Sequence, residues 1–265
     1  MCVVRPPDGP GRAPLSADEL MADDSTELTQ PAPEGTDEVA VLSAGDIEIL
    51  GRMPWSSNAT YLVALHHDGI EARAIYKPHR GERPLWDFPS GLYKREVAAY
   101  ELSEAMGLHL VPTTVLRDGP FGDGSVQWFV EADFRQHYFS MHETQPELHD
   151  QFRNMAVFDY VANNTDRKSG HCLLDSKGRI WGIDNGLCFS AEFKLRTVIW
   201  EFGGEPLDET HTAVLEPLAS TVPLRVATLL DSDEAHAISE RAAELLDAGT
   251  FPIDHSGRRY PWPLV

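Results

Sequence analysis

Two aspartates lie at the two ends of a short predicted hairpin, within the segment NNTDRKSGHCLLDSKGRIWGIDNG (163–186). HCLL and RIWGI predict short strands, and DSKG between them has the Asp and Gly that a type I turn prefers. A hairpin brings its ends together, so we expect the carboxylates of Asp166 and Asp184 to be neighbours. Taken singly, each has a plainer interpretation: Asp166 as an acid of a loop after a helix, and Asp184 as part of an ordinary Asp-Asn-Gly turn.

A lysine and a glutamate lie upstream, at positions where charge is expected to have a partner. Lys77 ends the predicted strand IEARAIYKP (70–78), and Glu96 lies in the predicted helix GLYKREVAAYELSEAMG (91–107), on a strip of uncharged residues. A buried carboxylate without a partner is costly, and a strand lysine paired with a helix glutamate positions phosphates in protein kinases. The alternatives are an edge-strand lysine and an ordinary pair within or beside the helix.

The chemistry that uses these four residues together is phosphoryl transfer. It requires a cation to hold phosphates, carboxylates for Mg²⁺ and an acceptor for the proton of the nucleophile. The lysine, the glutamate and the two aspartates fill these roles in chain order. The polar loop PWSSN (54–58) lacks glycines, but Ser56, Ser57 and Asn58 offer hydrogen bonds to phosphates.

The periodicity predicts an α+β, two-lobed fold of the protein-kinase type, with a β-rich N-lobe, a mainly helical C-lobe and a cleft between them. Strands are expected at 46–53, 59–65, 70–78, 113–119 and 125–133, and helices at 91–107, 148–164, 208–220 and 233–248. We divide the chain into a disordered acidic tail (1–38), the N-lobe (39–131) and the C-lobe (132–265). The tail holds nine acids against two bases, too polar to bury a core.

The net charge of −20, from 42 acids and 22 bases, argues against nucleic-acid binding and against unaided docking on anionic lipid. No apolar run is long enough for a membrane span, and the N-terminus lacks the apolar core of a secretory signal. Three scattered cysteines, Cys2, Cys172 and Cys188, favour neither a disulfide framework nor a metal site. A reducing, cytoplasmic location is the expectation.

The quoted motifs resemble those of a known superfamily. VFDYVANNTDRKSGHCLL followed by GIDNGLCF is similar to the catalytic and metal-binding loops of the phosphatidylinositol 3-/4-kinases, and most of all to the type II phosphatidylinositol 4-kinases. AIYKPHRGERP and REVAAYELSEAMGLHLVPTT resemble the nucleotide-binding lobe of that family. The resemblance covers about residues 41–200 and indicates a bacterial branch of the superfamily.

This resemblance implies roles for individual residues. Lys77 would bind the α- and β-phosphates of ATP, with Glu96 orienting it; Asp166 would be the catalytic acid and Asp184 a Mg²⁺ ligand. Asp159 would tie down the catalytic loop. The hinge around adenine would comprise Gln127, Trp128, Phe129, Val130 and Glu131.

One position departs from the family pattern. The family usually has an asparagine five residues after the catalytic aspartate, as a second metal ligand, and this chain has His171 there. Imidazole is a softer ligand than Mg²⁺ prefers. Use of Mn²⁺, a single metal or lost activity are therefore all open.

Three functions follow from these observations. The first is an ATP-dependent kinase acting on a hydroxyl of an unidentified protein or small molecule. The second is a nucleotide-binding pseudokinase or scaffold with little catalysis, which His171 motivates. The third is a phosphoinositide lipid kinase, which conflicts with the acidic charge.

Overall fold

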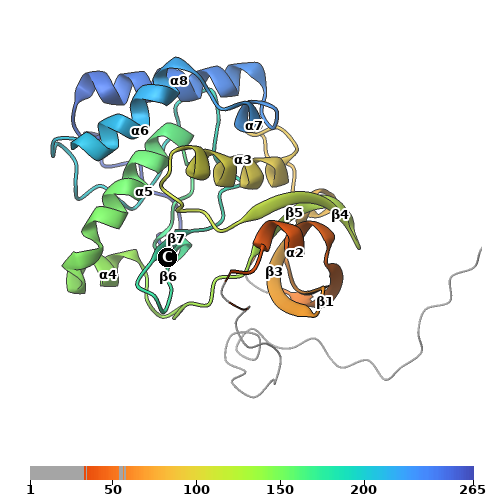
Figure 1. Cartoon of the computed structure of the whole chain (residues 1–265). Coiled ribbons are helices and arrows are strands. Elements are labelled where there is room, and N and C mark those ends of the chain that lie inside the picture. Colours follow the sequence, from red (N-terminus) through yellow and green to blue (C-terminus); the bar gives the residue numbers. More distant parts are fainter. Residues whose placement is uncertain (1–32, 34, 54–55, 57) are drawn as a thin grey trace, which may run out of the picture.

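The computed structural model describes residues 33, 35–53, 56 and 58–265. The first part of this chain is a five-stranded antiparallel sheet in the order β1-β2-β3-β5-β4. Its strands are β1 (Asp46–Arg52), β2 (Tyr61–His67), β3 (Ile70–Pro78), β4 (Thr114–Gly119) and β5 (Gly122–Trp128). All five expected strands are therefore present, and they lie beside the helical part of the molecule (Figure 1).

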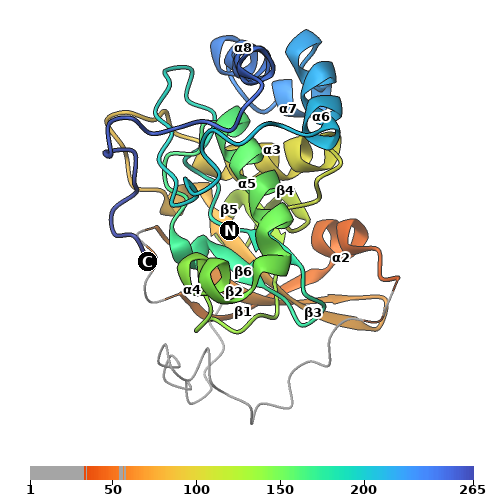
Figure 2. The ribbon, with the colours of Figure 1, turned by 90° about the vertical axis from the view of Figure 1, so that its left-hand side faces the viewer.

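The second part is mainly helical. It contains α4 (Tyr138–Thr144), α5 (His149–Ala162), α6 (Glu209–Ser220), α7 (Leu224–Ala227) and α8 (Ser232–Ala248). The two-stranded hairpin of β6 (Cys172–Leu174) and β7 (Ile180–Gly182) follows α5. In Figure 2, α6, α7 and α8 lie at the far end of the helical part from α4 and β6. The expected α+β fold, with a β-sheet in the N-terminal part of the chain and a mainly helical C-terminal part, is confirmed.

Helix α3 (Leu92–Ala105) connects the two parts. It contacts β4 and β5 of the sheet as well as α5 and α7. Its buried face, including Ala98, Ala99 and Leu102, belongs to the large apolar cluster of the helical part. Although α3 falls within the predicted N-lobe, its packing therefore fixes the position of the sheet relative to the helices.

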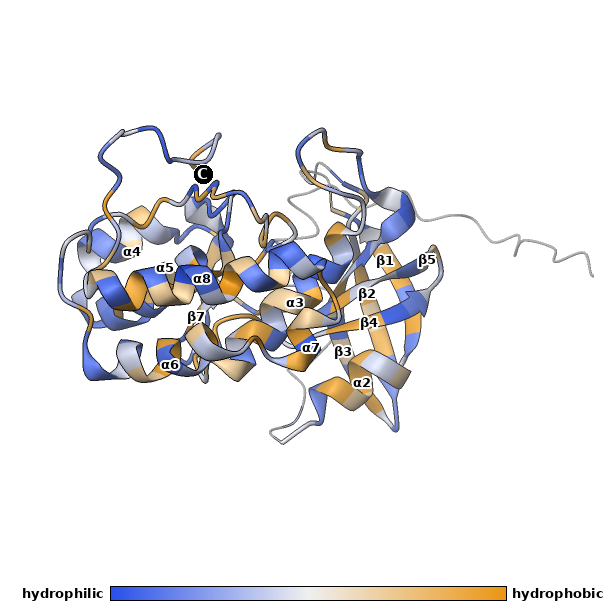
Figure 3. Cartoon of the chain, turned by 90° about the horizontal axis from the view of Figure 1, so that it is seen from above, coloured by the Kyte–Doolittle hydropathy of each residue, from blue (hydrophilic) through white to orange (hydrophobic). Residues whose placement is uncertain are grey.

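Side-chain hydropathy follows this packing. Figure 3 shows hydrophobic residues along the strands, while α5, α6 and α8 carry both hydrophobic and hydrophilic residues. In β2 the run Leu62–Leu65 is buried throughout, whereas β3 alternates between buried and half-buried positions. These two patterns indicate that β2 is covered on both faces and that β3 is covered mainly on one.

A short helix, α2 (Glu38–Ala44), precedes the sheet and was not expected from the sequence. Asp37 caps its first turn by accepting a hydrogen bond from the backbone N–H of Ala40 at 3.0 Å. Arg117 of β4 donates to the carbonyl oxygens of Leu42 and Gly45 at the other end. Asp37 and Glu38, which we had placed in the tail, thus belong to this helix.

Apart from this helix, the boundaries given above for the tail, the N-lobe and the C-lobe stay a prediction. Residues 1–32 and 34 of the tail, and Pro54, Trp55 and Ser57 of the PWSSN loop, lie outside the described residues.

Leu42 provides a test of whether α2 is an integral part of the fold. Its side chain is fully buried in the apolar cluster under the sheet, whereas Val39 on the same helix is 46% exposed. Leu42→Ala is expected to lower the free energy of unfolding by about 2–5 kcal/mol, and the control Val39→Ala by less than about 0.5 kcal/mol. Urea unfolding measures the free energy of unfolding of both variants. An effect of Leu42→Ala as small as that of the control would place α2 outside the cooperative unit.

Candidate active site

The side chain of Lys77 lies between two carboxylates from different parts of the chain. Its ammonium contacts Glu96 of α3 and lies 2.8 Å from Asp184 Oδ1, just after β7. Burial by itself lowers the pKa of Lys77, but Asp184 and Glu96 favour the charged ammonium and together raise that pKa above its usual value. The expected pairing of Lys77 with Glu96 is present, and it extends to Asp184.

Glu96 also contacts the loop that carries Asp184. One carboxylate oxygen pairs with Lys77, and the other accepts a hydrogen bond from the backbone N–H of Asn185 at 3.0 Å. Glu96 is almost fully buried. Its two oxygens therefore hold β3, α3 and the loop after β7 in one fixed relation.

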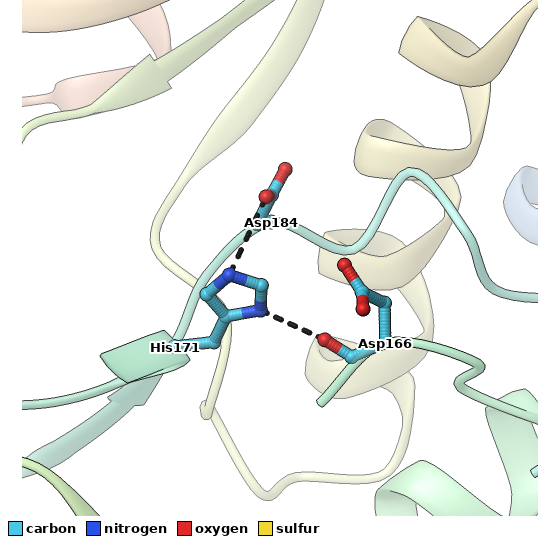
Figure 4. A group of neighbouring side chains, drawn as sticks. All are labelled: Asp166, His171 and Asp184. Atoms are coloured by element: carbon cyan, nitrogen blue, oxygen red, sulfur yellow. Dashed lines mark hydrogen bonds and ion pairs between the residues drawn. The ribbon is translucent and has the colours of Figure 1, made fainter. Parts of the chain in front are cut away.

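Asp166 and Asp184 are neighbours, as the hairpin predicts. Figure 4 shows both carboxylates beside the His171 imidazole, that of Asp184 above the ring and that of Asp166 to its right. Ligand atoms of these three residues all lie within 4.8 Å of one another, and they form a possible metal-binding group in the described part of the chain. The hairpin thus brings together the three polar groups that the sequence spreads over 19 residues, from position 166 to position 184.

Asp184 adopts a left-handed backbone conformation, with φ of 58°. This region is unfavourable for most residues, although Asp tolerates it in turns, and such strain is often found at functional sites. The ammonium of Lys77 holds the pKa of Asp184 well below its usual range, and His171 adds to the effect. Asp184 is therefore ionised across the physiological pH range.

The carboxyl group of Asp166 has the opposite shift. Burial raises its pKa, and the ammonium of Lys168, 3.0 Å from Oδ2, acts against that rise. The backbone N–H of Asp166 donates to Asn164 Oδ1 at 2.9 Å, which fixes the loop around it. A half-buried carboxylate of raised basicity suits a proton acceptor.

The ring of His171 is oriented by a backbone hydrogen bond. Its Nδ1 lies 2.9 Å from the carbonyl oxygen of Asp166, and because a carbonyl can only accept, Nδ1 carries the proton. Burial lowers the pKa of His171 to about 4, so the ring is neutral at pH 7. The lone pair of Nε2 then faces Asp184 Oδ2 at 3.5 Å.

This arrangement fits a divalent cation. A neutral nitrogen and a carboxylate oxygen that face each other are both acceptors, and a cation between them satisfies both. Two carboxylates and one imidazole suit Mg²⁺ or Mn²⁺, and the imidazole makes the set better suited to Mn²⁺ than oxygen ligands alone would be.

A cavity of about 280 Å³ opens beside these residues. It is lined by Lys77, Glu96, Asp166 and Asp184, and also by Ser56 and Asn58 of the loop before β2. The Ser56 and Thr60 hydroxyl oxygens are 2.8 Å apart. The structure thus brings two described residues of the PWSSN loop to the same cavity as the four charged residues.

The five expected hinge residues lie elsewhere and are not among the residues that line this cavity. Gln127 is buried and donates to Thr114 Oγ1 at 2.9 Å. Phe129 packs under the guanidinium of Arg73, which also pairs with Glu131. Trp128 ends β5 and packs against the cluster under the sheet, and Val130 is buried. Their role in adenine binding stays a prediction.

Arg167, next to Asp166, is a structural residue that the sequence did not reveal. Its side chain is fully buried and forms an ion pair with Asp159 of α5 at 3.0 Å. It also donates to the Ile183 carbonyl at 2.9 Å and to Asn185 Oδ1 at 2.8 Å. One guanidinium therefore joins α5, the Asp166 loop and the Asp184 loop, and Asp159 has the anchoring position that the resemblance implied.

A strand lysine paired with a helix glutamate, facing two loop aspartates, is the arrangement of nucleotide sites in kinases. The sequence profile of the family Phosphatidylinositol 3- and 4-kinase matches residues 91–223, which include Glu96, Asp166, His171 and Asp184. The chain is also 37% identical over 264 residues to Protein Rv2133c of Mycobacterium tuberculosis (strain ATCC 25618 / H37Rv), covering 86% of this chain and 95% of that protein. The chain belongs to the phosphatidylinositol 3- and 4-kinase family.

Two solved structures are similar to the chain at low identity. The Helicobacter pylori proinflammatory kinase CtkA has a TM-score of 0.49 and 11% identity, covering 77% of this chain and 92% of that one. Hydra Fam20, solved with sugar, has a TM-score of 0.49 and 14% identity, covering 88% and 94%.

The buried ion pair leads to a stability prediction. Asp159→Asn leaves the Arg167 guanidinium without a counter-charge in the interior, so we expect the free energy of unfolding to fall by about 3–5 kcal/mol. Asp150→Asn is the matched control on α5, because the Asp150 side chain is 93% exposed and pairs with Arg153 at the surface. Its effect should stay below about 0.5 kcal/mol. Denaturant unfolding of the two variants measures the difference, and similar losses would contradict the anchoring role of Asp159.

Proposed function

We propose that this chain is an ATP-dependent phosphotransferase, a kinase that transfers the γ-phosphoryl group of ATP to a hydroxyl group of a protein or small molecule. The observation that carries the proposal is the position of Lys77, paired with Glu96 and Asp184 on the wall of a cavity that Asp166 also lines. Family membership supports the same class of chemistry.

In this proposal each charged residue has one task. Lys77 holds phosphate oxygens of ATP, and Glu96 keeps the lysine charged and in place. Because Lys77 also pairs with Asp184, the nucleotide phosphates would replace that carboxylate as its partner. Asp184 would then be free to hold a metal ion together with His171.

Asp166 receives the proton of the attacking hydroxyl. Its raised pKa makes its carboxylate a better base than an exposed aspartate, while Lys168 keeps it ionised. Mg²⁺ or Mn²⁺, held by Asp184 and His171, would supply positive charge that neutralises the phosphates. Ser56, Ser57 and Asn58 are proposed to donate hydrogen bonds to phosphate oxygens, and residues 127–131 to line the adenine site.

The acceptor is the least defined part of the proposal. Among the families of the superfamily, the motifs resemble the type II phosphatidylinositol 4-kinases most. The net charge of −20 opposes binding to anionic membranes, and none of the described helices is long and apolar enough to cross a bilayer. We therefore favour a protein or small-molecule acceptor over a lipid, and a cytoplasmic location. Co-sedimentation of the protein with phosphoinositide vesicles would instead support a lipid acceptor.

His171 motivates a second candidate, a nucleotide-binding pseudokinase. Its imidazole replaces the amide oxygen of the family pattern and hydrogen-bonds to the Asp166 carbonyl. A protein of this kind would be stabilised by ATP against thermal unfolding without turning it over. Thermal unfolding with and without ATP, measured beside ATP turnover, therefore distinguishes the two candidates.

Asp166→Asn tests the phosphotransfer proposal directly. Removal of the proton acceptor is expected to reduce ATP turnover by at least about a hundredfold, with either Mg²⁺ or Mn²⁺ present, because asparagine keeps the shape but not the basicity. Asp247→Asn, an exposed position on α8, is the control and should retain full activity. Equal rates of ATP turnover in the wild type and in Asp166→Asn would contradict the proposal. To identify the acceptor, phosphoproteins and metabolites would be compared between cells that carry the wild-type chain and cells that carry Asp166→Asn.

A further inference from the structure

The cavity carries more negative than positive charge, although the proposed ligand is a polyanion. Four carboxylates and only two cations line it in the described part of the chain: Glu82, Glu96, Asp166 and Asp184, with Lys77 and Arg83. The chain as a whole is also strongly acidic. Any site for a phosphate chain here therefore depends on where unneutralised positive charge is available.

The positive charge of Lys77 is already opposed by two carboxylates, Glu96 and Asp184. Glu82 is engaged in a different way. Its two oxygens accept hydrogen bonds from the backbone N–H groups of Gly91 at 2.9 Å and Tyr93 at 2.8 Å. Glu82 thereby caps the N-terminus of α3, where a negative charge is stabilised.

Arg83 differs from both. Its guanidinium forms no hydrogen bond or ion pair with any residue that the structure describes, and the residue is exposed at the cavity. Its backbone N–H donates to Asn58 Oδ1 at 2.9 Å. The segment after β3 is thereby attached to the PWSSN loop, which places Arg83 on the same wall as Ser56 and Asn58.

We propose that Arg83 is a second phosphate-binding cation, which holds oxygens of the nucleotide phosphate chain at the rim of the cavity while Lys77 holds them inside. The inference rests on the proposed function for the identity of the nucleotide. A guanidinium presents parallel N–H groups that match two phosphate oxygens. Asn58 is the positioning residue, because its side chain fixes the backbone of Arg83.

Arg83→Gln tests this role, with Arg80→Gln as the matched control. Arg80 is an exposed arginine in the 3-10 turn His79–Gly81, three positions away, and it does not line the cavity. Calorimetry measures the binding of ATP and of adenosine, each with Mn²⁺. Arg83→Gln is expected to weaken ATP binding about tenfold, the equivalent of about 1.4 kcal/mol, and to leave adenosine binding unchanged.

Three results would overturn the inference. The first is wild-type ATP affinity in Arg83→Gln, and the second is an equal loss in Arg80→Gln, which would indicate a general effect of charge. The third is an equal loss for ATP and adenosine, which would indicate a disturbed pocket. Each of these leaves the proposed function intact, whereas failure of the wild type to bind ATP contradicts both. Arg83→Lys should recover part of the affinity.

Discussion

The ion pair between Arg167 and Asp159 is the interaction on which the site depends. A fully buried guanidinium must have all its donors satisfied, and the acceptors here come from α5, from Ile183 and from Asn185. Because Arg167 follows Asp166 and its acceptors flank Asp184, one side chain sets the distance between the two aspartates. Thr197 and Asn164 also donate to Asp159, which extends the network to the segment after the site.

The carboxylate of Glu96 joins the sheet to this network. Glu96 divides its oxygens between Lys77 of β3 and the backbone of Asn185, while the rest of α3 packs into the helical part. The proposed phosphate-binding cation and the proposed metal ligands are therefore positioned relative to each other by the buried contacts of Glu96 and Arg167. Such pre-organisation is what phosphoryl transfer requires of a protein, since positioning and charge provide most of its catalysis.

The sequence predicted the parts of this design that depend on local pattern. Alternation gave the strands, the DSKG turn gave the hairpin and thereby the approach of Asp166 to Asp184, and the uncharged strip around Glu96 indicated its burial. Arg167 and Arg83 could not be predicted in the same way, because each is an ordinary charged residue in a polar loop. The burial of Arg167 arises from contacts with residues distant in the sequence. The position of Arg83 at the cavity, with no described partner for its guanidinium, depends on the same tertiary arrangement. Helix α2 was missed because it has only seven residues, of which Val41 and Leu42 are buried, too few to show a period.

The central claim is that Asp184 and His171 hold a metal ion beside Asp166 and Lys77. A crystal structure with Mn²⁺ and a non-hydrolysable ATP analogue, with anomalous scattering recorded at the manganese edge, tests it most directly. The account predicts a manganese peak bonded to a carboxylate oxygen of Asp184 and to His171 Nε2, with the phosphate chain against Lys77. A peak bonded to other residues, or an analogue bound away from Lys77, would contradict it.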